Sequence, residues 1–138
     1  MKKYLLTILA LVFLSCLSAS VASQEESGSA DPKVVGVLFY ADWCGSCKVL
    51  EPKLNKVKKD FMDQPVLFTR FDLTDDFTRQ QSKLYANLID MQNIYTENAG
   101  KTGFMLLVNP KDKRVLGKVI KTQSEQEIKA TIQTALKN

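Results

Sequence analysis

The hydrophobic and polar positions of this chain form four strand-like runs separated by helix-like stripes. Each run is short, mainly apolar and rich in β-branched or aromatic side chains, which is typical of strands. The runs cover residues 34–40, 66–71, 104–108 and 115–120. We expect the first two to be buried. The last two should form a hairpin, because turn residues lie between them at 109–113.

Apolar side chains also recur at helical spacing in three other segments. The stripes are Leu50, Leu54, Val57 and Phe61; Leu84, Leu88, Met91 and Tyr95; and Ile128, Ile132 and Leu136. Pro52 lies inside the first stripe and should kink that helix, because proline has no backbone N–H to donate. Residues 72–76 supply turn and N-cap chemistry before the second helix. Ser124 and Glu127 have the spacing of a capping box and open the third helix.

The predicted order is strand, helix, strand, helix, strand, strand, helix. Strands that alternate with helices and then end in a hairpin favour an α/β fold, with a central mixed sheet and helices on both faces. The 138 residues suffice for one domain, which we expect to occupy 34–138. The polar, small-residue segment at 23–33 is typical of a flexible leader.

Residues 1–22 have the pattern of a secretory signal peptide. A basic start precedes an apolar stretch at 4–17, and small residues follow at 18–22. The apolar stretch is too short to span a membrane comfortably. We therefore expect cleavage after Ala22 and export to the periplasm or another extracytoplasmic compartment. Cys16 leaves an alternative open, in which this cysteine is lipidated and anchors the protein to a membrane.

The composition excludes several classes of function. Without residues 1–22, which contain Lys2 and Lys3, the net charge falls from +4 to about +2, and this is no electrostatic footprint for nucleic acid. The chain has no histidine, which excludes Ser-His-Asp and Cys-His catalysis and histidine-ligated metal sites. We expect no metal, no cofactor and no nucleic-acid partner.

The segment Trp43-Cys44-Gly45-Ser46-Cys47 carries the strongest chemical signal. It follows a predicted strand and opens a predicted helix, and a Cys-x-x-Cys pair in that setting indicates reversible disulfide chemistry. Unpaired N–H groups at a helix start favour a thiolate, so Cys44 is the candidate nucleophile and Cys47 the candidate resolving thiol. Gly45 and Ser46 set the flexibility of the disulfide ring, and the N–H and hydroxyl of Ser46 should help to stabilise the Cys44 thiolate. Trp43 should either support partner docking or pack over the helix start.

Two other interpretations of the cysteine pair have to be weighed. The pair could be a static structural disulfide, and the domain would then be a binding module. It could also be half of a metal site. Such a site needs four ligands, and the chain has neither a second Cys-x-x-Cys pair nor a histidine to complete it.

The segment 39–48, Phe-Tyr-Ala-Asp-Trp-Cys-Gly-Ser-Cys-Lys, is similar to the active-site segment of thioredoxins. Pro52 falls at the position of that family's helix-kinking proline, and the predicted order of elements agrees from Val34 onward. The sequence Tyr-Ala-Asp-Trp-Cys also resembles exported members, such as the reductase domain of the membrane thiol transporter DsbD. The resemblance implies a thioredoxin-like fold and thiol–disulfide oxidoreductase activity. It further implies protein disulfides as substrates and a membrane thiol carrier as electron donor.

The chain departs from the family pattern in several places. Leu38 stands where the family has a buried carboxylate, so we expect slow resolution of mixed disulfides. Gly103 stands where the family has a cis-proline, and since a cis bond before another residue type costs ~3 kcal/mol, we expect a trans bond. The resemblance implies that Thr102 and Gly103 contact substrate. Arg70 stands near the end of the second strand, where the family often has a lysine close to the active site, and it either lends positive potential there or is an ordinary exposed charge at a strand end. The segment 75–103 is longer than in the family, which implies an extra loop or longer helix near the site. The leader is too short for the strand and helix that open full thioredoxins, which implies a shortened N-terminus.

The sequence therefore predicts an exported thiol–disulfide oxidoreductase that reduces or exchanges disulfides in extracytoplasmic proteins. Cys44 and Cys47 would be its redox pair. The alternative is a redox-inert binding module of the same fold, in which 75–103 docks a partner. Copper delivery, a third interpretation, is disfavoured because relatives with that role are expected to use histidine.

Overall fold

The computed structural model describes residues 31–138. The predicted signal peptide at 1–22, the predicted lipid anchor at Cys16 and the predicted shortened N-terminus lie outside the described residues. Most of the predicted leader at 23–33 does so as well. Within residues 31–138, no helix combines the length and the apolar character needed to cross a membrane.

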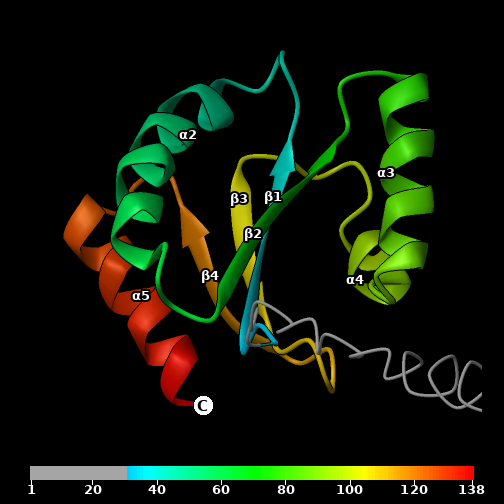
Figure 1. Ribbon diagram of the computed structural model, residues 1–138. Coiled ribbons are helices and arrows are strands. Elements are labelled where there is room, and N and C mark those ends of the chain that lie inside the picture. The colour runs from blue at the N-terminus through cyan, green and yellow to red at the C-terminus, as the bar shows by residue number, and fades with distance from the viewer. Residues whose placement is uncertain (1–30) are drawn as a thin grey trace, which may run out of the picture.

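A four-stranded sheet forms the centre of the domain, with the strand order β2-β1-β3-β4 (Figure 1). The strands are β1 (Val34–Tyr40), β2 (Val66–Asp72), β3 (Phe104–Val108) and β4 (Val115–Ile120). β1 pairs with β2 in parallel and with β3 antiparallel, and β3 and β4 form an antiparallel hairpin. The predicted mixed sheet and its hairpin are therefore confirmed.

Helices cover both faces of this sheet (Figure 1). On one face lie α2 (Gly45–Val57), its short 3-10 extension η2 (Lys58–Phe61) and α5 (Glu125–Lys137). On the other face lie α3 (Asp76–Leu88) and α4 (Gln92–Glu97). Each face has its own cluster of buried apolar side chains. The predicted α/β fold with helices on both faces is thus confirmed.

β1 supplies side chains to both clusters, because successive residues of a strand point to opposite faces of a sheet. Leu38 belongs to the cluster under α2 and α5, whereas Val37 and Phe39 belong to the cluster under α3 and α4. Burial on both faces explains why this strand is apolar at nearly every position. The strand leads directly into the turn that carries the cysteines, so two packed cores hold the start of α2 in place.

The first and last helical stripes are buried as predicted. The fully or almost fully buried members are Leu50, Leu54, Val57, Phe61, Ile128 and Ile132, and Leu136 is partly buried. Ser124 caps α5 and accepts the Glu127 N–H at 3.2 Å, while Asp75 caps α3 in the same way. Pro52 lies inside α2, which continues through it from Gly45 to Val57, so the predicted kink stays a prediction.

The predicted stripe of the second helix is wrong for half of its members. Leu84 and Leu88 are 62% and 76% exposed, whereas Met91 and Tyr95 are buried as predicted. The reason is a break in the helix. α3 ends at Leu88, and Asp90 adopts a left-handed φ of 57° before α4 begins, so the four side chains do not share one helical face.

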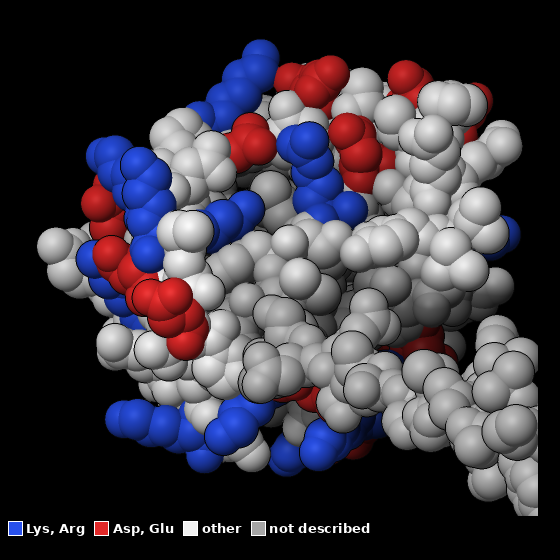
Figure 2. Space-filling model, viewed as in Figure 1, with Lys and Arg blue, Asp and Glu red and all other residues white. Residues whose placement is uncertain are grey.

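α3 buries small residues and leaves apolar ones uncovered. Ser82 and Ala86 face the sheet, and the Ser82 hydroxyl donates to the main-chain carbonyl of Asp72 at 2.8 Å. Figure 2 shows a largely uncharged area over α3. Phe77, in the first turn of the helix, contributes a further exposed apolar side chain. The hydrogen bond from Ser82 fastens the helix to the end of β2, close to the cysteine turn.

The prediction that β2 is a buried strand is also wrong. β2 lies at the edge of the sheet, and Phe71 is its only fully buried residue. Leu67 is about half exposed. An apolar pattern predicts a strand, but the burial of that strand depends on what lies beside it. Within residues 31–138, no further strand covers this edge.

Candidate active site

The two cysteines of the Trp-Cys-Gly-Ser-Cys segment form a disulfide bond at the start of α2. β1 ends at Tyr40, and the N–H of Cys44 donates to the carbonyl of Ala41 at 3.1 Å, which closes a tight turn between strand and helix. Cys44 is the N-cap residue of α2, with φ −79° and ψ 106°, and Cys47 lies in the first helical turn. Their Cα atoms are 5.3 Å apart, as bridged cysteines require.

The start of the helix directs an N–H group at the sulfur of Cys44. The N–H of Cys47 donates to Cys44 Sγ at 3.1 Å, so sulfur takes the place of the oxygen in an ordinary N-cap. In the dithiol form, this N–H and the partial positive charge of the helix start would favour a thiolate at Cys44. Within the described residues no hydrogen bond joins Ser46 to Cys44, and the expected contribution of Ser46 stays a prediction.

The two cysteines are both buried but to different degrees. Cys47 has no exposed surface, whereas Cys44 keeps 6% of its surface exposed. Cys47 Sγ lies 3.8 Å from the carbonyl oxygen of Phe39 in β1. In residues 31–138, no three His, Cys, Asp or Glu side chains are grouped so that they could hold a metal ion. Cys44 is thus the more accessible of the two cysteines, and its small exposed area makes access to it sensitive to the surrounding residues.

Thr74 fastens the cysteine turn to the segment that leads into α3. The N–H of Asp42 donates to Thr74 Oγ1 at 3.0 Å, and the indole N–H of Trp43 donates to the Thr74 carbonyl at 2.9 Å. The N–H and the hydroxyl of Thr74 both donate to Asp72 Oδ1, at 3.0 Å and 2.6 Å. The sequence did not predict this site residue. Thr74 belongs to no motif and lies 31 residues from Trp43, so only the register of the two strands could have suggested it.

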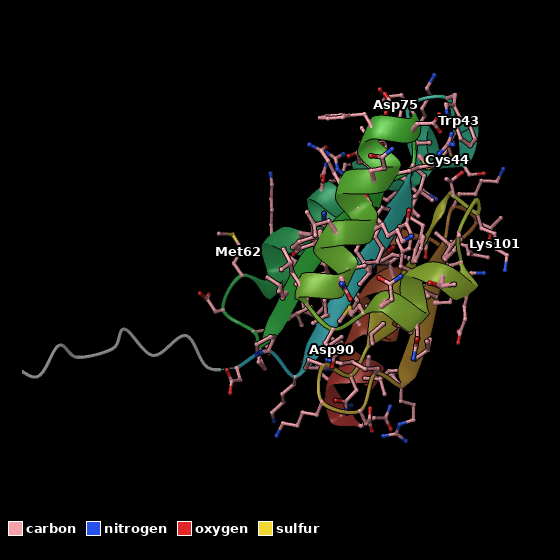
Figure 3. All side chains as sticks on the ribbon, turned by 90° about the vertical axis from the view of Figure 1, so that its right-hand side faces the viewer. Trp43, Cys44, Met62, Asp75, Asp90 and Lys101 are labelled. Carbon is pink, nitrogen blue, oxygen red and sulfur yellow. A yellow bond between two sulfur atoms is a disulfide. The ribbon has the colours of Figure 1, made fainter. Side chains whose placement is uncertain are left out.

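Trp43 lies at the end of the molecule that carries the disulfide, and it is 60% exposed. Figure 3 places Trp43, Cys44 and Asp75 together at this end, and Asp90 at the opposite end. The segment 75–103 therefore begins beside the candidate active site, runs to the opposite end of the molecule at Asp90, and returns to the site at Gly103. The exposed indole is suited to partner docking, which stays a prediction.

Gly103 comes from a distant part of the chain and lies against the cysteine pair. Its φ of 90° is in the region that favours glycine, and its N–H donates to the Phe39 carbonyl at 2.8 Å. A Cβ atom on Gly103 would lie 3.3 Å from Cys44 Sγ. None of the peptide bonds in residues 31–138 is cis, so the predicted trans bond before Gly103 is confirmed. Thr102 is partly exposed beside it, and Gly45 is exposed at the first position of α2.

Arg70 lies beside the candidate site rather than in it. Its guanidinium pairs with Glu51 Oε1 at 3.3 Å and lies 4.8 Å from the centroid of the Tyr40 ring. Tyr40 packs against the cysteines, so one aromatic ring separates Arg70 from them. The Tyr40 hydroxyl donates to Asp42 Oδ1 at 2.8 Å, and this hydrogen bond is the main reason that the pKa of Tyr40 is raised. Any positive potential from Arg70 therefore acts across that ring.

Leu38 is buried in β1, between Arg70 in β2 and Met105 in β3. With Glu51 and Lys58 it lines a surface hollow of about 410 Å³. Burial of Lys58 lowers the pKa of its ammonium group. The side chain at position 38 can neither accept nor donate a proton, and the expected slow resolution of mixed disulfides stays a prediction.

Comparisons with known proteins agree with this geometry. The family model described as Thioredoxin matches residues 20–93, which include both cysteines. Thioredoxin-T of Drosophila melanogaster is 40% identical over 50 residues, which are 36% of this chain and 32% of the relative. Thioredoxin F, chloroplastic, of Oryza sativa subsp. japonica is 44% identical over 48 residues, which are 35% of this chain and 25% of the relative. The alignments thus span no more than about a third of these two relatives.

A solved thioredoxin structure from Malassezia sympodialis is similar to 78% of this chain and to 81% of its own chain, with 19% identity and a TM-score of 0.49. The family model covers more than half of the present sequence. It spans the strand, the cysteine turn and the helix that build the candidate active site. The chain therefore belongs to the thioredoxin family.

Proposed function

We propose that the protein is an exported thiol–disulfide oxidoreductase that reduces disulfide bonds in extracytoplasmic proteins. The observation that carries this proposal is the Cys44–Cys47 disulfide at the start of α2, with the Cys47 N–H directed at the Cys44 sulfur at 3.1 Å. Membership of the thioredoxin family supports the same chemistry. The signal-peptide pattern at 1–22 and the resemblance of 40–44 to exported members support export.

The reaction begins with the pair in its dithiol form, in which Cys44 is ionised. The Cys44 thiolate attacks one sulfur of the substrate disulfide. A bond forms between the two sulfurs, and the other substrate sulfur leaves as a thiolate. The N–H of Cys47 stabilises the negative charge before the attack. Because Cys47 is fully buried, Cys44 is the sulfur that the substrate meets.

Cys47 completes the exchange. Its thiol loses a proton to solvent, and the resulting thiolate attacks the Cys44 sulfur. The mixed disulfide breaks, the second substrate sulfur leaves as a thiolate, and the Cys44–Cys47 disulfide forms. Two electrons pass from the pair to the substrate, and both substrate thiolates take up protons from solvent. Leu38 offers no carboxylate to assist the deprotonation, so we expect this second step to be slow.

The oxidised pair has to be reduced before the next cycle. An exported protein is out of reach of cytosolic reductases, so the proposed electron donor is a membrane thiol carrier. Cleavage after Ala22 would release the protein, whereas lipidation at Cys16 would hold it at a membrane. The mass of the mature protein from an exporting host distinguishes these two outcomes.

Reduction of insulin by dithiothreitol tests the proposed activity. The wild type should accelerate precipitation of the insulin B chain, and Cys44→Ala should abolish the acceleration. Cys47→Ala should accumulate mixed disulfides through Cys44, because nothing is left to release the partner. Cys44→Ala is the matched control in this trapping experiment and should capture no partner.

The midpoint potential distinguishes an oxidoreductase from the alternative binding module. A potential between ~−120 and −270 mV is typical of exchange chemistry, whereas a value below ~−300 mV is typical of a structural disulfide. A midpoint potential below ~−300 mV, together with no acceleration of insulin reduction, would overturn the proposal in favour of the binding module.

A further inference from the structure

Gly103 and Ser46 meet at the surface of the Cys44 sulfur, although one precedes β3 and the other opens α2. A Cβ atom on Gly103 would lie 2.6 Å from the Cβ of Ser46, 3.3 Å from Cys44 Sγ and 3.4 Å from the Ser46 hydroxyl oxygen. Non-bonded carbon atoms attract one another best at about 3.5–4.0 Å, so the first distance is a steric conflict. Residue 103 therefore has to be glycine as long as residue 46 has a side chain.

Neither backbone can move away easily from this contact. The N–H of Gly103 is bound to the Phe39 carbonyl at 2.8 Å, and β3 begins at the next residue, Phe104. Ser46 lies in the first turn of α2, where the helix determines the direction of its Cβ. A side chain at position 103 would therefore press on the helix start for which Cys44 is the N-cap.

We propose that Gly103 and Ser46 form a coupled pair that controls access to the Cys44 sulfur. Cys44 is only 6% exposed, so a methyl group 3.3 Å from its sulfur would cover a large share of the surface that a partner can reach. Glycine at 103 lets the main chain of a substrate segment that carries a disulfide approach the sulfur. A side chain there, in conflict with Ser46, would exclude it. This role in substrate selection rests on the proposed oxidoreductase function, whereas the steric coupling does not.

Gly100 provides a matched control. It also has a positive φ, 79° against 90° for Gly103, but a Cβ atom on Gly100 would meet nothing within 4 Å. A change from glycine to alanine at either position imposes a similar backbone cost, because alanine disfavours left-handed conformations. Only Gly103→Ala adds contacts with Ser46 and with the Cys44 sulfur, so the difference between the two variants isolates these contacts from the backbone cost.

The experiment measures how fast iodoacetamide alkylates Cys44 in the reduced full-length chain carrying Cys47→Ala, followed by the mass of the peptide that contains Cys44. Gly103→Ala should slow alkylation by about tenfold or more, because the added methyl group covers the sulfur and the contact with Ser46 prevents it from moving aside. Gly100→Ala should slow it by less than about twofold. Adding Ser46→Gly to Gly103→Ala should restore most of the rate, because the methyl group can then move away from the sulfur into the space left by the Ser46 side chain. Ser46→Gly alone completes the double-mutant cycle.

Equal alkylation rates for Gly103→Ala and Gly100→Ala would overturn the coupling. Failure of Ser46→Gly to restore the alkylation rate of Gly103→Ala would overturn it as well. If Gly103→Ala does not fold, the double variant decides the question. A folded Gly103→Ala/Ser46→Gly protein supports the coupling, and an unfolded one overturns it.

Insulin reduction by the same variants with both cysteines intact separates this inference from the proposed function. If the wild type does not reduce insulin but the alkylation pattern is observed, the oxidoreductase proposal fails and the coupling stands. If the wild type reduces insulin and the alkylation pattern is absent, the coupling alone fails.

Discussion

Replacing Thr74 with valine removes the hydroxyl group that links the cysteine turn to the end of β2, while the shape of the side chain is kept. In the wild type, Thr74 Oγ1 accepts the Asp42 N–H at 3.0 Å and donates to Asp72 Oδ1 at 2.6 Å. Valine can make neither bond. The main-chain bonds of residue 74, from its N–H to Asp72 at 3.0 Å and from the Trp43 indole to its carbonyl at 2.9 Å, are still possible. The variant therefore isolates the hydroxyl.

The expected loss in the free energy of unfolding is about 2 kcal/mol. A hydrogen bond between neutral groups contributes about 0.5–1.5 kcal/mol, and one to a charged group about 1.5–3 kcal/mol. Both bonds here belong at the low end, because Asp42 is exposed to water and the Asp72 carboxylate keeps the Thr74 N–H as a donor. Thr74→Ser is the control. It keeps the hydroxyl and loses one half-buried methyl group, which should cost about 0.4 kcal/mol.

Urea unfolding of the oxidised protein, followed by far-UV circular dichroism, gives the stability difference. The chain has one tryptophan, so its fluorescence reports on the candidate active site alone. Acrylamide should quench Trp43 more efficiently in Thr74→Val than in Thr74→Ser, because the turn at 41–44 is held less tightly. Equal stability of the two variants, together with equal quenching, would refute the argument that the hydroxyl holds this turn.

Three further substitutions test the domain. Leu38→Asp should resolve mixed disulfides faster than Leu38→Asn in stopped-flow experiments. Both variants should lose about 2–5 kcal/mol of stability, because both remove a buried leucine side chain. Equal rates of resolution would contradict a role for a carboxylate at position 38. The Thr78 N–H holds the pKa of Asp75 below its usual value, so the cap stabilises the fold above about pH 4 and is lost as the pH falls through the folded pKa. Asp75→Asn should remove this pH dependence in urea unfolding, and an unchanged profile would exclude it. Tyr95→Phe should cost about 1 kcal/mol in the same assay, because the hydroxyl donates to the Arg79 carbonyl at 3.0 Å, and no loss would show that this bond is not stabilising.

The strands and two of the longer helices could be predicted because their signals are local. β1 is buried on both faces and is apolar at nearly every position, so its own residues suffice to identify it. α5 begins with a capping box and continues with a single buried stripe, and both features lie within the helix and its cap. Signals of this kind do not depend on the rest of the chain.

The burial of α3 and β2 could not be predicted, because it depends on their neighbours. Leu84 and Leu88 have the spacing of a core stripe, but Ser82 anchors the opposite face of the helix to the sheet. The left-handed residue Asp90 then separates α3 from α4. For β2, the deciding fact is its place at the edge of the sheet, and a strand's own residues do not encode strand order.

The distinction between local features and features that depend on neighbouring elements also indicates which residues of the candidate active site should select the substrate. Cys44 and Cys47 lie within one helical turn, so five consecutive residues sufficed to predict their chemistry. Thr74, which holds the cysteine turn, follows β2, and Gly103, which borders Cys44, precedes β3. Only the pairing of β2 and β3 with β1 brings these two residues to the cysteine turn. Strand order thus determines which loops surround the sulfur, and substitutions in those loops can change access without altering the Cys-x-x-Cys motif. Two proteins with an identical motif can therefore differ in substrate, and the residues at positions 103 and 46 should be compared first, as a pair.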